Sequence, residues 1–203
     1  DTEMFIDSDY YGGCGYSAYG YLIRTQNGKT WLYLETMGEG DGKYLQIFEL
    51  MKNDLRLVTA DYLGIDPNQP FEPESFVLSN ILGTYEAYKK FHVEEDGIPK
   101  TEDLLWTIVS TYTDWKVELT SSIDMELSVR EANTKRGSGQ KETLPAGTHF
   151  VLLKTDGEAY AEAMLDDGQI CEFELEHPSE EEWEGRINGV SISDCFEYVP
   201  YAG

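Results

Sequence analysis

The segment TLPAGTHFVLLKTDGEAYAEAMLDDGQ, residues 143–169, decides how the C-terminal half of the chain folds. It holds a Pro-Ala-Gly turn, an apolar run, an alternating run, and Asp-Gly pairs at 156–157 and 167–168. Asp-Gly beside alternating apolar residues indicates a tight β-hairpin, because such turns need residues with positive φ. The segment therefore predicts antiparallel strands joined by short turns.

The same kind of turn signal divides the N-terminal half into strands. Four apolar, partly alternating segments are predicted to form an antiparallel meander; they span residues 19–25, 30–36, 43–50 and 54–60. Trp31 and Tyr33 point to one face of this sheet, whereas Leu32 and Leu34 point to the other. Because both faces are substantially apolar, we expect the sheet to be covered on both sides.

The remaining segments place the chain in the mostly-β class, with two domains. After a proline-rich loop at 65–75, two more strands are predicted at about 74–81 and 84–95, although the second also fits helical spacing. The segment 131–141 has almost no apolar residues and is expected to be a mobile surface loop. We predict an antiparallel β-sheet domain at 1–115, a blade-like meander, and a small β-barrel domain at 116–203.

The chain is strongly acidic. It has 15 Lys and Arg against 39 Asp and Glu, which gives a formal net charge of −24. Such a surface repels phosphate backbones and anionic lipid headgroups, and no apolar run approaches the roughly 20 residues of a membrane span. We therefore expect neither nucleic acid nor membrane insertion. Cationic polymers, metal ions and neutral glycans remain as partners, or the charge serves solubility alone.

The sequence does not decide whether the cysteines form a disulfide. Cys14, Cys171 and Cys195 are an odd number of thiols. Cys171 and Cys195 either pair with each other or are buried free thiols, and a chain of this size does not depend on disulfides.

The sequence begins at Asp1 without a methionine, signal peptide or lipobox cysteine. We expect that an N-terminal signal or lipoprotein segment has been removed.

The C-terminal half resembles bacterial SH3-like domains over residues 117–203. The residues that carry the resemblance are Leu144, Pro145, Gly147, Thr148, Phe150, Leu152, Tyr160, Leu165, Asp167 and Gly168. The resemblance implies a small SH3-like barrel and, for many such domains, binding of cell-wall peptides. One departure concerns the ligand groove: the family usually follows its final turn with Gly-Trp, whereas here Gly168 is followed by Gln169 and Ile170.

The N-terminal half, roughly residues 15–110, resembles a different group. It is similar to the propeller-blade-like sheets of uncharacterised secreted and lipoprotein-anchored proteins of Gram-positive gut bacteria. Those proteins also pair such a sheet with a C-terminal SH3-like barrel. The resemblance implies an extracellular or cell-envelope location and no particular activity.

Catalytic and metal-binding motifs are weak in this sequence. Cys14 lies in GGCGYS, but a nucleophilic cysteine needs a base, and His92 and His177 have no recognisable motif around them. The three histidines lack zinc-ligand spacing. Carboxylates in the Gly-rich segments 6–13 and 38–43 do not follow calcium-loop spacing, so they are either solvated turn residues or ligands of one structural ion. We predict no catalytic residue, metal or cofactor.

Aromatic residues supply the candidate binding site. Tyr160, Trp183, Tyr198 and Tyr201 are predicted to line a groove for an extended peptide, or else Trp183 only covers the barrel end. The tyrosines of 10–21 are either a stacking platform or sheet packing. The hypothesis is a non-catalytic extracytoplasmic binding module for wall peptide, glycan or another protein. The alternatives are a structural accessory that supports a neighbouring domain and a cysteine-dependent wall hydrolase.

Overall fold

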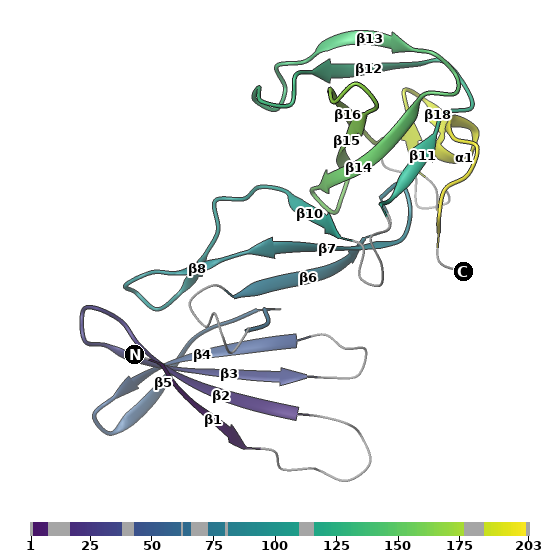
Figure 1. Ribbon diagram of the computed structural model, residues 1–203. Coiled ribbons are helices and arrows are strands. Elements are labelled where there is room, and N and C mark those ends of the chain that lie inside the picture. Colours follow the sequence, from purple (N-terminus) through teal and green to yellow (C-terminus); the bar gives the residue numbers. More distant parts are fainter. Residues whose placement is uncertain are drawn as a thin grey trace. The chain divides into compact units, whose positions relative to one another are not determined.

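The protein is mostly β and consists of two compact units. The computed structural model describes residues 2–7, 17–37, 43–61, 63–65, 73–79, 81–109, 116–176 and 185–201. Within these residues lie eighteen strands and one four-residue helix, α1 (Ile192–Cys195) (Figure 1). The N-terminal unit comprises residues 1–76 and 89–103, and the C-terminal unit comprises 77–88 and 104–203.

The N-terminal unit contains a five-stranded antiparallel meander, in which the strands follow one another in chain order (Figure 1). Its strands are β1 (Thr2–Asp7), β2 (Ser17–Arg24), β3 (Thr30–Met37), β4 (Lys43–Met51) and β5 (Asp54–Asp61). The four predicted strands of the meander are confirmed to within two residues at each end. The structure adds β1 at the edge of β2.

One face of this sheet carries the core of the N-terminal unit. Its buried members are Tyr21, Ile23, Trp31, Tyr33, Leu45, Ile47, Leu63 and Ile65. A small hairpin, β8 (His92–Val93) with β9 (Pro99–Lys100), packs on this face through Val93. The turn of this hairpin is tied down because the Tyr33 hydroxyl donates a hydrogen bond to the Gly97 carbonyl and Asn27 Nδ2 donates to the Glu95 carbonyl at 2.8 Å.

Gly97 is required by this contact. Its φ is +72°, and a Cβ at this position would lie 2.1 Å from the Trp31 ring. A side chain is therefore excluded both by backbone conformation and by space. The sequence signal Asp96-Gly97 thus marks a turn whose backbone must approach an indole closely.

The C-terminal unit is built on a longer antiparallel sheet. Nine strands share it, in the order β13-β12-β16-β15-β14-β10-β7-β6, with β11 also paired to β14. The strands are β6 (Glu74–Ser79), β7 (Tyr85–Lys90), β10 (Trp106–Val109), β11 (Glu118–Thr120), β12 (Met125–Arg130), β13 (Gln140–Leu144), β14 (His149–Thr155), β15 (Tyr160–Leu165) and β16 (Ile170–Glu174). A separate pair, β17 (Arg186–Ile187) and β18 (Val190–Ser191), precedes α1.

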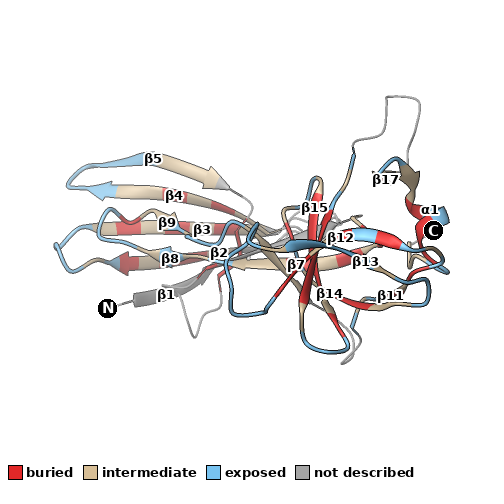
Figure 2. Ribbon diagram, turned by 90° about the horizontal axis from the view of Figure 1, so that it is seen from above, coloured by how far each residue is buried: buried red, intermediate tan, exposed pale blue. Residues whose placement is uncertain are grey.

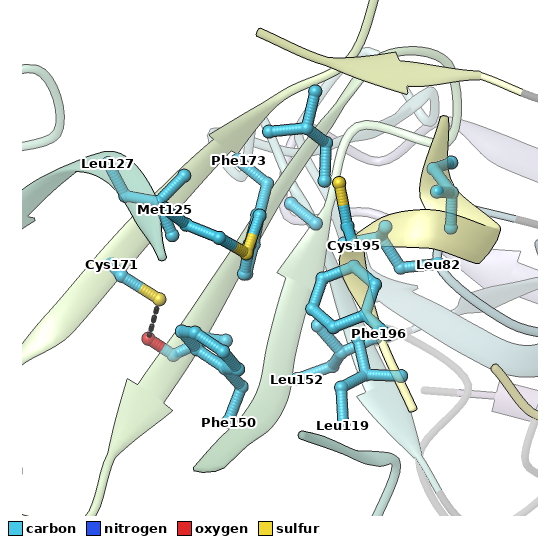
Figure 3. Close-up of a cluster of buried hydrophobic side chains, with 14 of the residues drawn as sticks. Leu82, Leu119, Met125, Leu127, Phe150, Leu152, Cys171, Phe173, Cys195 and Phe196 are labelled. Carbon is cyan, nitrogen blue, oxygen red and sulfur yellow. Dashed lines mark hydrogen bonds between the residues drawn. The ribbon is translucent and has the colours of Figure 1, made fainter. Parts of the chain in front are cut away.

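The core of the C-terminal unit is aromatic and contains both described cysteines (Figure 3). Phe150, Phe173 and Phe196 form three edge-to-face pairs with centroids 5.3 to 6.1 Å apart. Cys171 and Cys195 are free and buried. The Cys171 thiol donates to the Ala163 carbonyl at 3.5 Å, and burial raises its pKa to about 12. Of the two alternatives, the buried free thiols are therefore observed.

The compact units do not follow the expected division at residue 115. β10 pairs with β14 on one side and with β7 on the other. As a result Leu82, Tyr85 and Ala87 belong to the core of the C-terminal unit. The Thr84 N–H also donates to the Pro200 carbonyl at 2.9 Å. Residues 84–95 were open to a helical interpretation, but β7 is a strand.

Candidate functional site

The second face of the N-terminal sheet carries an apolar surface that spans four strands. Leu22, Leu32, Phe48 and Leu57 lie directly opposite one another across β2, β3, β4 and β5. Residues paired in this way share a face of the sheet. Leu34, Leu50 and Leu55 occupy the neighbouring positions on the same face. We call these seven residues the open face.

None of the seven side chains is buried. Leu22, Leu32, Leu34 and Phe48 are half-buried, while the exposed fractions of Leu50, Leu55 and Leu57 are 37%, 51% and 53%. Figure 2 shows the exposed residues around the β4–β5 turn in pale blue. The expected cover over the second face is thus not supplied by the described residues. Contiguous apolar surface of this kind marks an interaction site more often than isolated exposed leucines do.

The open face is also free of acidic side chains, in a chain that is rich in them. Among the described positions of β2 to β5, the acidic residues all lie on the opposite face; they are Glu35, Glu49, Asp54 and Asp61. Two of these carboxylates are paired there: Glu35 lies 3.6 Å from Lys43 Nζ, and Glu49 binds Lys29 at 3.0 Å and also Arg56. The hydrogen bond from Lys29, followed by that from Arg56, holds the pKa of Glu49 below its usual value.

A polar hollow lies elsewhere in the N-terminal unit. It has a volume of about 810 Å³ and is lined by Arg24, Thr25, Gln26, Val93, Glu94, Glu95 and Asp96. Two of its carboxylates are already paired, because Lys100 Nζ lies 2.6 Å from Glu94 and 2.9 Å from Asp96. Across the described part of the chain, no group of three or more His, Cys, Asp or Glu side chains has an arrangement that could hold a metal ion.

Tyr160, the first predicted groove residue, is inside the C-terminal unit. Its exposed fraction is 6%, its hydroxyl donates to Glu162 at 3.0 Å, and the Arg136 guanidinium lies 3.7 Å from its ring centre. Burial, followed by the carboxylates Glu162 and Glu172, raises the pKa of Tyr160. The ring of Tyr160 therefore packs under the loop 131–141, which contains Arg136, instead of lining an open groove.

The same place holds a buried ion network. Arg130 binds Glu162 at 2.9 Å and Glu172 at 3.1 Å, and all three side chains are less than a tenth exposed. Glu172 also accepts hydrogen bonds from the Gly137 N–H and the Ser128 hydroxyl, each at 2.9 Å. These contacts tie the backbone of the expected mobile loop, 131–141, to the sheet at Gly137. Its residues are nevertheless mostly exposed, as predicted.

The other residues predicted for the groove or for catalysis differ in their exposure, and some lie outside the described residues. Tyr198 is 70% exposed, and Tyr201 is half-buried. The described residues do not include Trp183, Cys14, His177 or most of the Gly-rich segments 6–13 and 38–43. His92 is exposed, and its Nε2 lies 3.4 Å from Glu94. Of the tyrosines in 10–21, Tyr21 is a buried core residue and Tyr19 packs against that core, which is the packing interpretation.

Comparisons with known proteins add no relative: no protein-family model, no curated protein and no solved structure matches the chain. The resemblance of residues 117–203 to SH3-like domains therefore stays a prediction, as does that of the N-terminal half to secreted sheet proteins. Within the described residues, no helix is long and apolar enough to cross a membrane.

The open face is the site that sequence reasoning did not nominate. Its signal was present, because Leu32 and Leu34 alternate with Trp31 and Tyr33 and make both faces apolar. From this pattern alone, the sequence predicts that both faces of the sheet are covered. Among the described residues, the buried core lies on one face only, and the leucines of the other face stay half-buried or exposed.

Proposed function

We propose that the chain is a non-catalytic binding module whose ligand is another protein, and that the open face is its contact surface. The row Leu22, Leu32, Phe48 and Leu57 carries this proposal. Apolar side chains that stay exposed on a flat sheet gain free energy when a partner removes them from water. Apolar centres of this type are found in the buried core of protein–protein interfaces.

The chemistry of the open face favours a protein over a glycan. Six of its seven side chains are leucines, which offer neither a hydrogen-bonding group nor a flat ring. Specific sites for polar ligands place polar groups among apolar ones to fix orientation. A protein partner needs no such groups at the centre of an interface, because shape and apolar contact suffice there.

The other parts of the hypothesis remain proposals beside this one. They are an extracellular or cell-envelope location, an SH3-like barrel at 116–203, and wall-peptide recognition by Tyr160, Trp183, Tyr198 and Tyr201. Because Tyr160 is buried, the peptide groove has less support than the open face. The structural accessory is the second candidate, since the same open face would pack against a neighbouring domain of a longer polypeptide.

Site-specific photo-crosslinking tests the proposal. A benzophenone amino acid replaces Leu57 on the open face or, as the matched control, Leu104, which is 80% exposed and lies in the C-terminal unit. Each protein is irradiated in an envelope extract of a Gram-positive bacterium. We expect saturable crosslinking to a protein from position 57 and none from 104. Excess wild-type chain should compete, whereas the variant Leu32→Asn/Phe48→Asn should not.

Two results would contradict the proposal. Equal crosslinking from positions 57 and 104 would show that the open face attracts no specific partner. Equal competition by the wild type and by Leu32→Asn/Phe48→Asn would show that the partner binds elsewhere.

A further inference from the structure

Among the described residues, the open face ends at the outer edge of β5. β5 is the last strand of the meander, and among the described residues it pairs only with β4. An edge strand presents a row of unpaired backbone N–H and C=O groups to its surroundings. Its eight residues include no proline, and the ladder to β4 is regular from Asp54 to Leu57, before a register shift near Val58. The stretch 54–57 is therefore suited to pairing with a further strand, which would replace the exposed hydrogen bond from the Leu55 N–H to Asp54 Oδ1 at 2.8 Å.

Two leucines of this edge are about half exposed. Leu55 lies opposite Leu50, and Leu57 lies opposite Phe48, yet about half of each leucine is exposed. A strand added beside β5 would place its own side chains against these two leucines. Apolar residues at alternate positions of that strand would extend the row Leu22, Leu32, Phe48 and Leu57 by one member.

Charge decides what the other positions of such a strand should carry. The N-terminal unit holds 18 Asp and Glu against 8 Lys and Arg. Several of its cations are already held in ion pairs: Lys29 and Arg56 with Glu49, Lys43 with Glu35, and Lys100 with Glu94 and Asp96. The excess charge is therefore negative, and it attracts a basic partner and repels an acidic one.

We propose that the partner presents an extended segment with alternating apolar and basic residues, which adds to β5 as a sixth strand. This inference rests on the proposed function of the open face. Backbone hydrogen bonds to residues 54–57 supply affinity, and apolar side chains contact Leu55 and Leu57. Basic side chains lie on the opposite face beside Asp54, where the nearby Arg56 is already paired with Glu49. A second copy of the chain does not fit, because each copy carries a net charge of −24.

Synthetic peptides of nine residues test this proposal against the full chain. The probe alternates Leu and Lys. One control alternates Leu and Glu, a second alternates Ser and Lys, and a third is the Leu-Lys probe with proline at two central positions. Binding is measured by fluorescence anisotropy, below the concentration at which the peptides self-associate. We expect the Leu-Lys probe to bind at least about tenfold more tightly than each control, which corresponds to about 1.4 kcal/mol.

Variants of the chain locate the binding edge. Leu57→Asn should weaken the Leu-Lys probe about tenfold, whereas Leu104→Asn should leave its affinity unchanged. Higher salt should weaken binding, because part of the attraction is electrostatic. Equal affinity for the proline-containing peptide would overturn strand addition, and equal affinity for the Leu-Glu peptide would overturn the basic partner. Unchanged affinity in Leu57→Asn would place the peptide away from β5.

Failure of strand addition can be distinguished from failure of the proposed function of the open face. Crosslinking from position 57 together with equal binding of the proline-containing peptide would leave the open face as a docking surface and reject strand addition. Sedimentation equilibrium tests whether the occupant of the β5 edge is a second copy of the chain. A concentration-dependent dimer that Leu57→Lys abolishes would overturn the inference in favour of self-association.

Discussion

Leu32 on β3 and Phe48 on β4 lie directly opposite each other and are half-buried, whereas their neighbours Tyr33 and Ile47 form an opposed pair that is fully buried on the other face. The two pairs belong to the same two strands and differ by one residue in register. One pair is covered by residues of this chain, and the other is left with an apolar surface. This asymmetry is the structural basis of the docking surface proposed above.

The asymmetry should be visible in the free energy of unfolding. Leu45→Ala should destabilise the N-terminal unit by about 2–5 kcal/mol, because Leu45 is fully buried in its core. Leu57→Ala should change stability by no more than about 0.5–1 kcal/mol, because half of this side chain is already in water. Urea unfolding followed by tryptophan fluorescence measures both. Similar losses in the two variants would mean that the open face is covered in solution.

Gly97 and Gly28 form a matched pair of turn glycines. Both have positive φ, but a Cβ at Gly97 would collide with Trp31, whereas none of the atoms described lies within 4 Å of a Cβ at Gly28. Gly28→Ala should cost about 1–2 kcal/mol through its backbone conformation alone. Gly97→Ala should cost a further 1–3 kcal/mol or so through overpacking. Thermal unfolding measures the difference, and equal shifts in the two variants would refute the close approach to Trp31.

The buried ion network should be sensitive to loss of its cation. Arg130→Ala leaves Glu162 and Glu172 without their shared partner and should destabilise the C-terminal unit by about 3–5 kcal/mol. Lys141→Ala removes an exposed pair with Glu126 and should change stability by less than about 1 kcal/mol. Chemical unfolding followed by near-UV circular dichroism measures both variants. An Arg130→Ala variant as stable as Lys141→Ala would contradict the network.

The pH dependence of stability should report on Glu172. Burial alone would raise its pKa, but the Gly137 N–H, the Ser128 hydroxyl and Arg130 together hold it below the usual value of 4.5. A carboxylate with a lowered folded-state pKa contributes stability above its unfolded pKa, and this contribution is lost as the pH falls through the folded-state value. Wild type should therefore exceed Glu172→Gln in stability near neutral pH, and the gap should narrow below about pH 4.5.

Melting temperatures of the two proteins from about pH 6 to about pH 2.5 measure this gap. Serial unfolding scans at fixed ionic strength keep screening constant across the series. A gap that stays constant down to the lowest pH would show that Glu172 does not titrate with the folding of the C-terminal unit.

Truncation at the expected domain boundary should fail. A fragment of residues 116–203 lacks Leu82, Tyr85 and Ala87, which are buried in the C-terminal core. Loss of Leu82 alone should cost about 2–5 kcal/mol. We expect this fragment to lack a cooperative thermal transition, whereas residues 77–203 retain one. Calorimetry distinguishes the two, and a cooperative, equally stable 116–203 fragment would contradict the packing of β7 against β10.

Local patterns predicted the strands well, because hairpin turns and alternation act between neighbouring residues. The Asx-Gly turns that end in Gly28, Gly97, Gly157, Gly168 and Gly189 all have the positive φ that this prediction requires. β1 was missed because TEMFID is short and interrupted by charge. The unit boundary was missed because it depends on pairing of β10 with both β14 and β7, which are far apart in sequence.

The candidate site was harder to predict than the fold. Tyr160 was expected to line a groove, but Arg136 and Glu162 give its ring and hydroxyl partners inside the unit. Glu162 and Glu172 could not be singled out among 39 acidic residues, because their role depends on cross-strand register. The open face follows from alternation in β3, yet alternation cannot reveal which face the rest of the chain covers.

The course of the backbone constrains how this protein can have changed during evolution. The chain passes from one unit to the other after residues 76, 88 and 103. Neither unit is therefore a contiguous cassette that a single recombination event could add, remove or transfer to another gene. A single proteolytic nick likewise cannot release either unit free of residues that belong to the other. We therefore expect variation within the loops of the two units instead of exchange of whole modules.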